Sequence, residues 1–558
     1  MPVLRAFIYL FFTLFLFIPL VAILLTALTG DLVNIPGAFT SIERLTATVG
    51  RVAEKLTAEH LLELVTVQRY LDATRNSLLL SAAVALLCVI LTLPIAYGLA
   101  RTALPVKWLI GGLALFPLIL PSFIAADGFM LMFGRVGWAT QIYQALGGSG
   151  VPIDIRSWVA VLITQTLTFS PFALLPMTAN FKLIDPVLEE AGQSLGAHRL
   201  LTWLTVTAPL AGPGIAASAL LVFVITLSDF GAPVILSPRQ FPLLSVEAYR
   251  EMSGYFNWAG AATLALVLAI LASFFLYLQR SVLRRGQYAM IAPVAGRRGI
   301  VTDRKVTMPL FAYALAFLSF PIALVASVAL QSFATTWGWR LLPDGYTLEN
   351  YAEVLSTSPA IYNSLLLGLG ALVVSLVIGA GAAYLVVRGR MTSLDFVGNL
   401  PLAIPGVALG IALILTFNSP PVKLTGTAFL LICAYALRRL PHMLRTTAAA
   451  IAQVKRDLEE AALNLGATPG LMIWTVVAPL VLPGIIAGCI LVFVTVIKEI
   501  SVTVLLAPAR WGPMSLEVFR HLLRGEFYLA SAMAMLILAI VAVLQFAAQR
   551  LAGERALF

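Results

Sequence analysis

Four ionisable residues lie inside long apolar runs of this sequence. They are Asp127, Asp229, Lys498 and Glu499. A charged side chain inside a membrane is costly, so each is a candidate for the lining of a translocation path. Asp229 follows Pro209 by about 20 residues, which is about 30 Å of helix, and we expect Asp229, Lys498 and Glu499 near the outer ends of their spans. The alternative is that these groups reach the membrane interface or pair with each other.

Four histidines and three cysteines offer no second kind of chemistry. The histidines are scattered, without a nucleophile and a base spaced to act together, and the cysteines lie inside apolar runs. We expect small buried cysteines, neither disulfides nor a zinc site, and no other bound metal. The chain contains no Gly-Lys dipeptide and hence no phosphate-binding P-loop, so we expect a protein that is not an enzyme. These residues are His60, His198, His442 and His521, and Cys88, Cys433 and Cys489.

The composition is typical of a membrane protein. Of the 558 residues, 60% are hydrophobic and 11% are charged, whereas a soluble domain has about 25% charged residues. Apolar windows of 18 or more residues recur, each long enough to cross about 30 Å of hydrocarbon. We predict an all-α membrane protein with about twelve transmembrane helices, near residues 6–28, 77–99, 108–133, 158–180, 209–236, 259–279, 307–331, 364–387, 397–417, 425–445, 477–506 and 529–548.

Basic residues predict the orientation of these helices. The link 281–306 is rich in arginine and almost free of acidic residues, which is typical of a cytoplasmic segment. Alternation from this link places both termini in the cytoplasm. The same orientation places Arg438 and Arg439 near the inner surface, where their side chains would reach the lipid headgroups. The net charge of +10 therefore reflects topology, and we expect membrane lipid and no nucleic acid as a partner.

The chain consists of two related halves. A shift of 270 residues aligns residues 189–215 with residues 459–485 without a gap, and a shift of 287 aligns NSLLL at 76–80 with NSLLL at 363–367. Tyr97 and Arg101 likewise match Tyr384 and Arg388. We predict a first half at 1–280, the basic cytoplasmic linker at 281–306 and a second half at 307–558, each half with six transmembrane helices.

The repeated phrase predicts a helix–turn–helix in each half, at about 185–205 and 455–475. Each copy has a short run rich in Glu, Ala and Leu, which favours a helix. A glycine follows, Gly196 or Gly466, where the helix would end in a left-handed turn. A second short helix would then lead to Pro209 or Pro479 at the start of the next span.

Two further matched stretches, 237–258 and 507–528, lie on the predicted outer side. Each begins near a proline and an aromatic residue and continues as a predicted amphipathic helix. Both an interfacial helix with an aromatic belt and a contact surface for a solute-binding protein fit this pattern.

The repeated phrase resembles a motif of the permeases of binding-protein-dependent ABC importers. Those permeases carry Glu-Ala-Ala, three residues, Gly, nine residues and then Ile-x-Leu-Pro in a cytoplasmic loop. The departures are mild: Gly192 replaces an Ala, and Val and Ala replace Ile and Leu in both copies. The matching residues here are Glu190, Ala191, Gly196 and Pro209 in the first copy, and Glu460, Ala461, Gly466 and Pro479 in the second.

The resemblance implies the type I ABC importer permease fold, fused as two halves in one chain of the bacterial inner membrane. It implies that the phrase docks on two copies of a separate ATPase, which use ATP and Mg²⁺, so the chain itself needs no cofactor. It also implies a solute-binding protein outside. The implied coupling residues are Glu189, Glu190, Ala191 and Gly196, and Glu459, Glu460, Ala461 and Gly466.

The sequence indicates the transported substrate less clearly than it indicates the type of transporter. The stretches SDFGAP and KEISVTVLL resemble those of fused permeases for ferric iron, and related permeases import 2-aminoethylphosphonate, thiamine or polyamines. A secondary, ion-coupled transporter is the alternative from another class, because such proteins also have twelve spans in two halves. It would need coupling carboxylates near the midplane and would not need two matched cytoplasmic helix–turn–helices.

Overall fold

The computed structural model describes residues 2–287, 301–338 and 340–552. Within these ranges the chain is helical and has isolated β-bridges but no β-strand, so the all-α prediction is confirmed. The predicted linker 281–306 overlaps the end of α16 (Trp258–Gln287) and the start of α17 (Arg304–Ser332). Its central part, 288–300, lies outside the described residues.

Nine of the described helices are long and apolar enough to cross a membrane, and two bent pairs raise the number to eleven. The remaining predicted span, 425–445, corresponds to α23 (Ala428–Gln453), which carries Arg438, Arg439 and Arg445. The nine are Val3–Thr29, Gln68–Arg101, Trp158–Leu183, Leu200–Ser228, Trp258–Leu283, Arg304–Ser332, Ala360–Val387, Pro469–Ile497 and Phe527–Ala547.

Two predicted spans, 108–133 and 397–417, are sharply bent. The first bends by 102° between Lys107–Leu118 and Ser122–Ala145, and the second by 104° between Thr392–Ala403 and Gly406–Phe417. A proline stands directly before the second helix in each, Pro121 before α8 (Ser122–Phe133) and Pro405 before α22 (Gly406–Phe417). Proline lacks the N–H that a continuous helix needs, so each break has a local cause.

The described helices form two compact units that do not coincide with the sequence halves. Unit 1 contains 1–68, 247–269 and 348–557, and unit 2 contains 69–246 and 270–347. In unit 1, α2 (Ile18–Thr29) of the first half packs against α22 of the second half. In unit 2, α17 of the second half packs against α8 of the first half. The first span of each half thus packs with helices from the other half.

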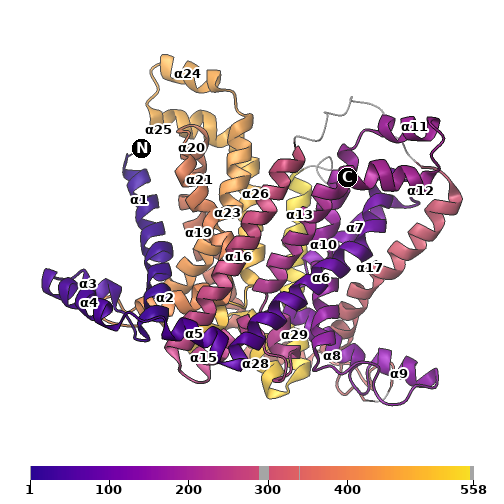
Figure 1. The fold of residues 1–558 in the computed structure, drawn as a ribbon, viewed down its shortest axis with the longest axis horizontal. Helices are drawn as coiled ribbons and strands as arrows, with labels where there is room; N and C mark the ends of the chain where they lie inside the picture. The colour runs from indigo at the N-terminus through magenta and orange to yellow at the C-terminus, as the bar shows by residue number, and fades with distance from the viewer. Residues whose placement is uncertain (1, 288–300, 339, 553–558) are drawn as a thin grey trace. The chain divides into compact units, whose positions relative to one another are not determined.

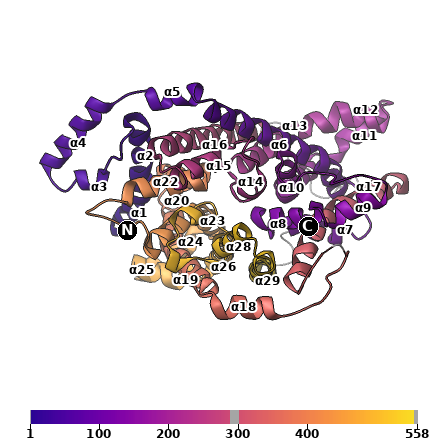
Figure 2. The same cartoon turned by 90° about the horizontal axis from the view of Figure 1, so that it is seen from below.

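The same pair of helices forms the centre of each unit. In unit 2, α10 (Trp158–Leu183) packs along α13 (Ala208–Ser228). In unit 1, α23 packs along α26 (Ala478–Ile497), as Figures 1 and 2 both show. Small residues allow the close approach. A Cβ on Gly484 of α26 would lie only 2.5 Å from the Ala450 Cβ of α23.

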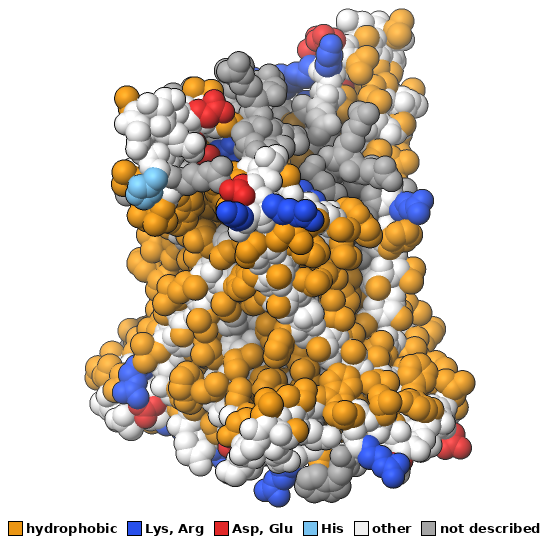
Figure 3. Space-filling model, turned by 90° about the vertical axis from the view of Figure 1, so that its right-hand side faces the viewer, with side chains coloured by type: hydrophobic (Ala, Val, Ile, Leu, Met, Phe, Trp, Pro, Cys, Tyr) orange, Lys and Arg blue, Asp and Glu red, His pale blue; other side chains and the backbone are white. Residues whose placement is uncertain are grey.

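Hydrophobic side chains cover a broad band of the face drawn in Figure 3, and the charged side chains visible there gather toward its two margins. This is the distribution expected of helices that expose their middle parts to lipid and their ends to water. Unit 2 contributes exposed apolar side chains to its surface, including Leu86, Ile90 and Phe274. The prediction of a multi-pass membrane protein is confirmed.

The two NSLLL stretches hold the two amphipathic helices, α15 (Leu244–Ser253) and α28 (Met514–Arg524). The Asn76 side chain donates to the Pro242 carbonyl (3.2 Å), and Ser77 Oγ accepts from the Leu244 N–H (2.8 Å). Unit 1 repeats this arrangement with Asn363 on the Gly512 carbonyl (3.1 Å) and Ser364 on the Met514 N–H (2.8 Å). The repeat in sequence is therefore a repeat in hydrogen bonding.

Close packing of α8 on α17 gives a first test. A Cβ at Gly128 would lie 2.6 Å from the Leu324 carbonyl oxygen, whereas a Cβ at Gly112 of α7 (Lys107–Leu115) meets no atom within 4 Å. We expect Gly128→Ala to lower the free energy of unfolding by about 1–3 kcal/mol through overpacking. Gly112→Ala should leave it unchanged or raise it by up to about 1 kcal/mol. Thermal unfolding of both variants in detergent measures the difference, and equal midpoints would contradict the packing.

Candidate functional site

The repeated phrase folds as a helix–turn–helix in both units, as predicted. The first copy contains α11 (Pro186–Ser194) and α12 (Arg199–Thr202), and the second contains α24 (Arg456–Asn464) and α25 (Pro469–Met472). We call residues 185–207 and 455–477 the repeat segments. Each second helix continues through a π-helical turn into the next span, α13 or α26. A displacement of a repeat segment therefore acts directly on a membrane helix.

The turn between the two short helices depends on glycine. Gly196 has φ +91° and Gly466 has φ +89°, in the region that side chains with a Cβ rarely adopt. The carbonyls of Ala191 and Ala461 accept from the N–H groups of the leucines just before these glycines, at 3.1 and 3.0 Å, which closes the helix end. No atom lies within 4 Å of an added Cβ at either glycine, so the backbone angle alone requires the residue.

The first glutamate of each pair tethers its repeat segment to a span. Arg388, at the end of α20 (Gly381–Val387), donates through Nε to Glu459 (2.6 Å) and through Nη2 to the Val454 carbonyl (2.8 Å). Arg101, at the end of α6 (Gln68–Arg101), donates to the Ile184 carbonyl (2.5 Å) and lies 3.7 Å from Glu189. The sequence shows these arginines as matched residues, but their partners are far away in the chain and were not predicted.

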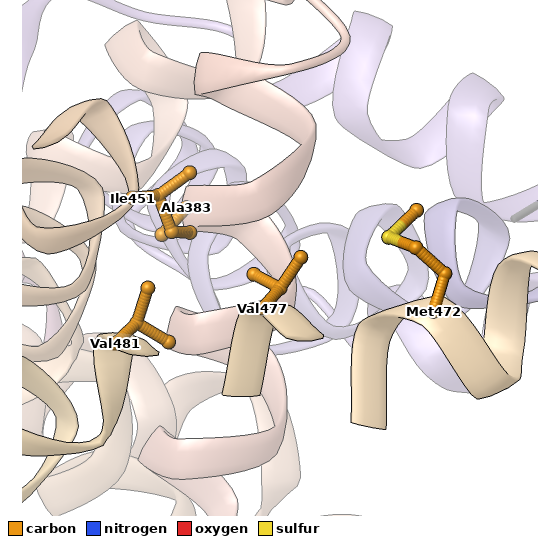
Figure 4. Packing of buried hydrophobic residues seen from close by; sticks show 5 residues of the cluster. All are labelled: Ala383, Ile451, Met472, Val477 and Val481. Atoms are coloured by element: carbon orange, nitrogen blue, oxygen red, sulfur yellow. The ribbon is translucent and has the colours of Figure 1, made fainter. Parts of the chain in front are cut away.

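An apolar cluster fixes the base of the second repeat segment. Met472 of α25, Val477 of the π-turn and Val481 of α26 are buried with Ala383 of α20 and Ile451 of α23 (Figure 4). Three spans therefore meet the segment at one place. Together with the Arg388–Glu459 pair, this cluster makes the segment and the span ends one packed body.

The outer face of each repeat segment is exposed. Leu195 and Leu465, which directly precede the turn glycines, are 90% and 89% exposed. Glu190 and Glu460, the second glutamates of the pairs, are also exposed, as are Ala191 and Ala461. In Figure 1, α11 with α12 and α24 with α25 stand at one end of the spans of their own units. The segments thus present a small apolar tip beside a carboxylate.

The four ionisable residues of the predicted path are divided between the two units. Asp127 and Asp229 belong to unit 2, and Lys498 and Glu499 belong to unit 1. Asp127 is fully buried on α8. Among the residues that the structure describes, no three His, Cys, Asp or Glu side chains come together as a metal site.

Asp229 ends α13 and is held by neutral donors. Its carboxylate accepts from Ser122 Oγ (2.7 Å), from Gln165 Nε2 (3.0 Å) and from the Gly231 N–H (3.3 Å). Its backbone carbonyl accepts from Ser245 Oγ (2.8 Å). The carboxylate therefore joins α8, α10 and α13 at the point where α13 breaks.

Glu499, the residue that matches Asp229, is instead held by arginines. Its carboxylate pairs with Arg438 (3.2 Å) and with Arg439, and it accepts from the Ser501 N–H (3.1 Å). The expectation that Arg438 and Arg439 reach the headgroups is wrong, because both guanidinium groups bind this buried carboxylate. The sequence could not show this, since the pair joins residues about 60 positions apart.

The contrast between the two carboxylates predicts different costs of neutralising them. Glu499→Gln leaves two arginines without their charge partner, and breaking a buried pair costs about 3–5 kcal/mol. Asp229→Asn keeps the shape and loses only charge assistance from neutral hydrogen bonds, at about 1 kcal/mol. We expect the thermal midpoint to fall clearly for Glu499→Gln and little for Asp229→Asn in the same detergent. Equal losses would show that Asp229 also has a cationic partner.

Several known proteins are similar to this chain in sequence. Residues 375–554 match the family described as "Binding-protein-dependent transport system inner membrane component". The ferric transport system permease protein FbpB of Actinobacillus pleuropneumoniae is 28% identical over 84% of this chain and 70% of its own length. The Fe(3+)-transport system permease protein FbpB 2 of Haemophilus influenzae is 28% identical over 67% of this chain and 72% of its own.

A shorter relative aligns with one part of the chain. The protein PhnV of Salmonella typhimurium, whose name assigns it to a 2-aminoethylphosphonate transport system as a permease, is 26% identical over 42% of this chain and 91% of its own length. A single permease thus corresponds to less than half of this chain, while the longer relatives align with most of it. Residues 375–554 thus carry the domain of binding-protein-dependent transport system inner membrane components, and the similarity of the longer relatives over most of the chain supports a fused double permease of an ABC importer.

Proposed function

We propose that this chain forms the solute path of an ATP-driven ferric iron importer and is driven by two copies of a separate ATPase that dock on its repeat segments. The observation that carries the proposal is the pair of matched repeat segments. Each has an exposed apolar tip and a base fixed to the spans of its own unit. A surface that only connects two helices has no need of either feature.

The tethers give the segments a mechanical role. In unit 1 the second repeat segment continues into α26, and Arg388 and the buried cluster link it to α20 and α23. A tilt of the docked segment would therefore move three spans together. ATP binding would draw the two docked segments together and open the path outward, and hydrolysis would reset it. Transport is then alternating access driven from outside the chain.

The same proposal assigns the two sides of the membrane. The repeat segments and both termini lie in the cytoplasm, where the ATPases hold ATP and Mg²⁺, and the chain itself binds no cofactor. A solute-binding protein delivers the substrate at the opposite end. In unit 1 the amphipathic helix α28 stands at the end opposite α24 and α25 (Figure 1), which suits a contact with that protein.

Ferric iron is favoured over the alternatives by the names of the relatives that align with most of the chain. Import of 2-aminoethylphosphonate, thiamine or a polyamine by the same machinery is the second possibility for the substrate. A secondary transporter is disfavoured, because it would have no use for two matched repeat segments with exposed tips.

Substitution at the exposed tips tests the docking. We expect Leu195→Asp with Leu465→Asp to reduce the ATPase that co-purifies with the chain by at least about tenfold, because an unpaired carboxylate would enter the interface. Leu146→Asp is the matched control, since Leu146 is 84% exposed beyond α9 (Trp138–Ala145), at the other end of unit 2. An ATPase that is retained by the double variant would contradict docking at the tips.

Uptake into vesicles tests the energy source and the substrate. We expect the complete transporter, reconstituted with its ATPase and binding protein, to import radioactive ferric iron only when ATP is present on the side of the ATPase. Ionophores that abolish proton and sodium gradients should leave the rate unchanged. Uptake that stops with the ionophores would indicate a secondary transporter, and uptake blocked by 2-aminoethylphosphonate would indicate the phosphonate substrate.

A further inference from the structure

The sites around Asp229 and Glu499 share one backbone frame. Each residue ends the central helix of its unit, α13 or α26. The Asp229 carbonyl accepts from Ser245 Oγ at 2.8 Å, and the Glu499 carbonyl accepts from Ser515 Oγ at 2.7 Å. Each carboxylate also accepts from the N–H two residues later, at 3.3 and 3.1 Å. A difference between the two sites therefore lies in the side chains that face the carboxylate.

The two carboxylates differ in whether arginine side chains pair with them. Arg438 and Arg439 on α23 pair with Glu499, and the 270-residue shift places Thr168 and Phe169 of α10 at the corresponding positions. Gly406 makes room for Arg438, because a Cβ there would overlap the guanidinium group. At the start of α8, the corresponding helix after the proline break, Ser122 donates its hydroxyl to Asp229 instead. Among the described residues, Asp229 has no ion pair with a Lys, Arg or His side chain.

The Asp229 site also holds an acceptor that has no donor. Gln165 is 0% exposed, and its Nε2 donates to Asp229, so its amide group lies at the site. Its Oε1 is buried and has no hydrogen-bond partner among the described residues. An unsatisfied buried acceptor costs about 1–3 kcal/mol. Asp229 is a partly exposed residue.

We propose that Asp229 and Gln165 form a transient binding site for a hard metal cation on the solute path, a proposal that rests on the function proposed above. The carboxylate supplies the negative charge that no arginine neutralises, and Gln165 Oε1 supplies a second oxygen ligand. Oxygen donors of this kind suit hard cations. One carboxylate gives weak binding, which transit requires, because a substrate that binds tightly does not leave.

Terbium is a suitable probe for this site, because Tb³⁺ is a hard trivalent cation that emits when a nearby tryptophan is excited. Trp158 precedes Gln165 by two turns of α10, about 10 Å along the helix. The full chain in lipid nanodiscs should show saturable Tb³⁺ emission. We expect Asp229→Asn to weaken the apparent affinity at least about tenfold and Gln165→Met about threefold. Asp154→Asn, which changes an exposed carboxylate of unit 2, should leave it unchanged.

Competition identifies the class of ligand. Ga³⁺ should displace Tb³⁺ at comparable concentrations, whereas spermidine, an organic polycation, should not. Either of two results overturns the proposal: an unchanged Tb³⁺ affinity in Asp229→Asn with the thermal midpoint preserved, or displacement by spermidine at lower concentrations than by Ga³⁺. The measurement needs neither the ATPase nor ATP. If the chain binds Tb³⁺ normally but shows no ATP-driven iron uptake, the importer proposal is contradicted. If ATP-driven iron uptake is observed but Tb³⁺ does not bind at Asp229, this inference alone is contradicted.

Discussion

A polar or charged group inside a membrane span must find its partner within the protein, because lipid offers none. This constraint explains why the two units agree in detail although most of their side chains differ. Asn76 and Asn363 donate to equivalent carbonyls in the segments before the amphipathic helices. Ser245 and Ser515 donate to equivalent carbonyls at the helix breaks. Spans can change their apolar surface freely, but these contacts fix where helices break and meet.

The tethers of the repeat segments follow the same constraint with one difference. In unit 1 Arg388 contacts Glu459 directly at 2.6 Å. In unit 2 the Arg101–Glu189 distance is 3.7 Å, and Thr207 Oγ1 donates to the same Glu189 oxygen at 2.8 Å. The residue that matches Thr207 is Val477, which packs in the apolar cluster instead. At this position the first segment is thus held by a hydroxyl and the second by apolar packing.

The sequence predicts what depends on neighbouring residues. The helix–turn–helix follows from helix formers beside Gly196 and Gly466, whose φ angles are positive as expected, and the spans follow from apolar length. The bends at Pro121 and Pro405 have a local signal in the prolines, but the sequence predicts a single span at each place and no bend. The contacts of Arg101, Arg388, Arg438 and Arg439 join distant segments, and so does the packing of each half's first span with helices of the other half. No periodicity in one stretch reports such pairings.

Helix α23 shows why pairing must be known before the cost of a charge can be judged. Its three arginines make it too polar to count as a span by composition, and it packs along α26 at the centre of unit 1. Two of them neutralise Glu499, and Arg445 donates to the Asn399 side chain at 2.8 Å. The guanidinium groups of Arg438 and Arg439 therefore face a buried carboxylate and not lipid, and paired charges cost far less there than isolated ones. The same reasoning sets Asp229 apart from Glu499, because among the described residues its carboxylate accepts from neutral donors and has no ion pair.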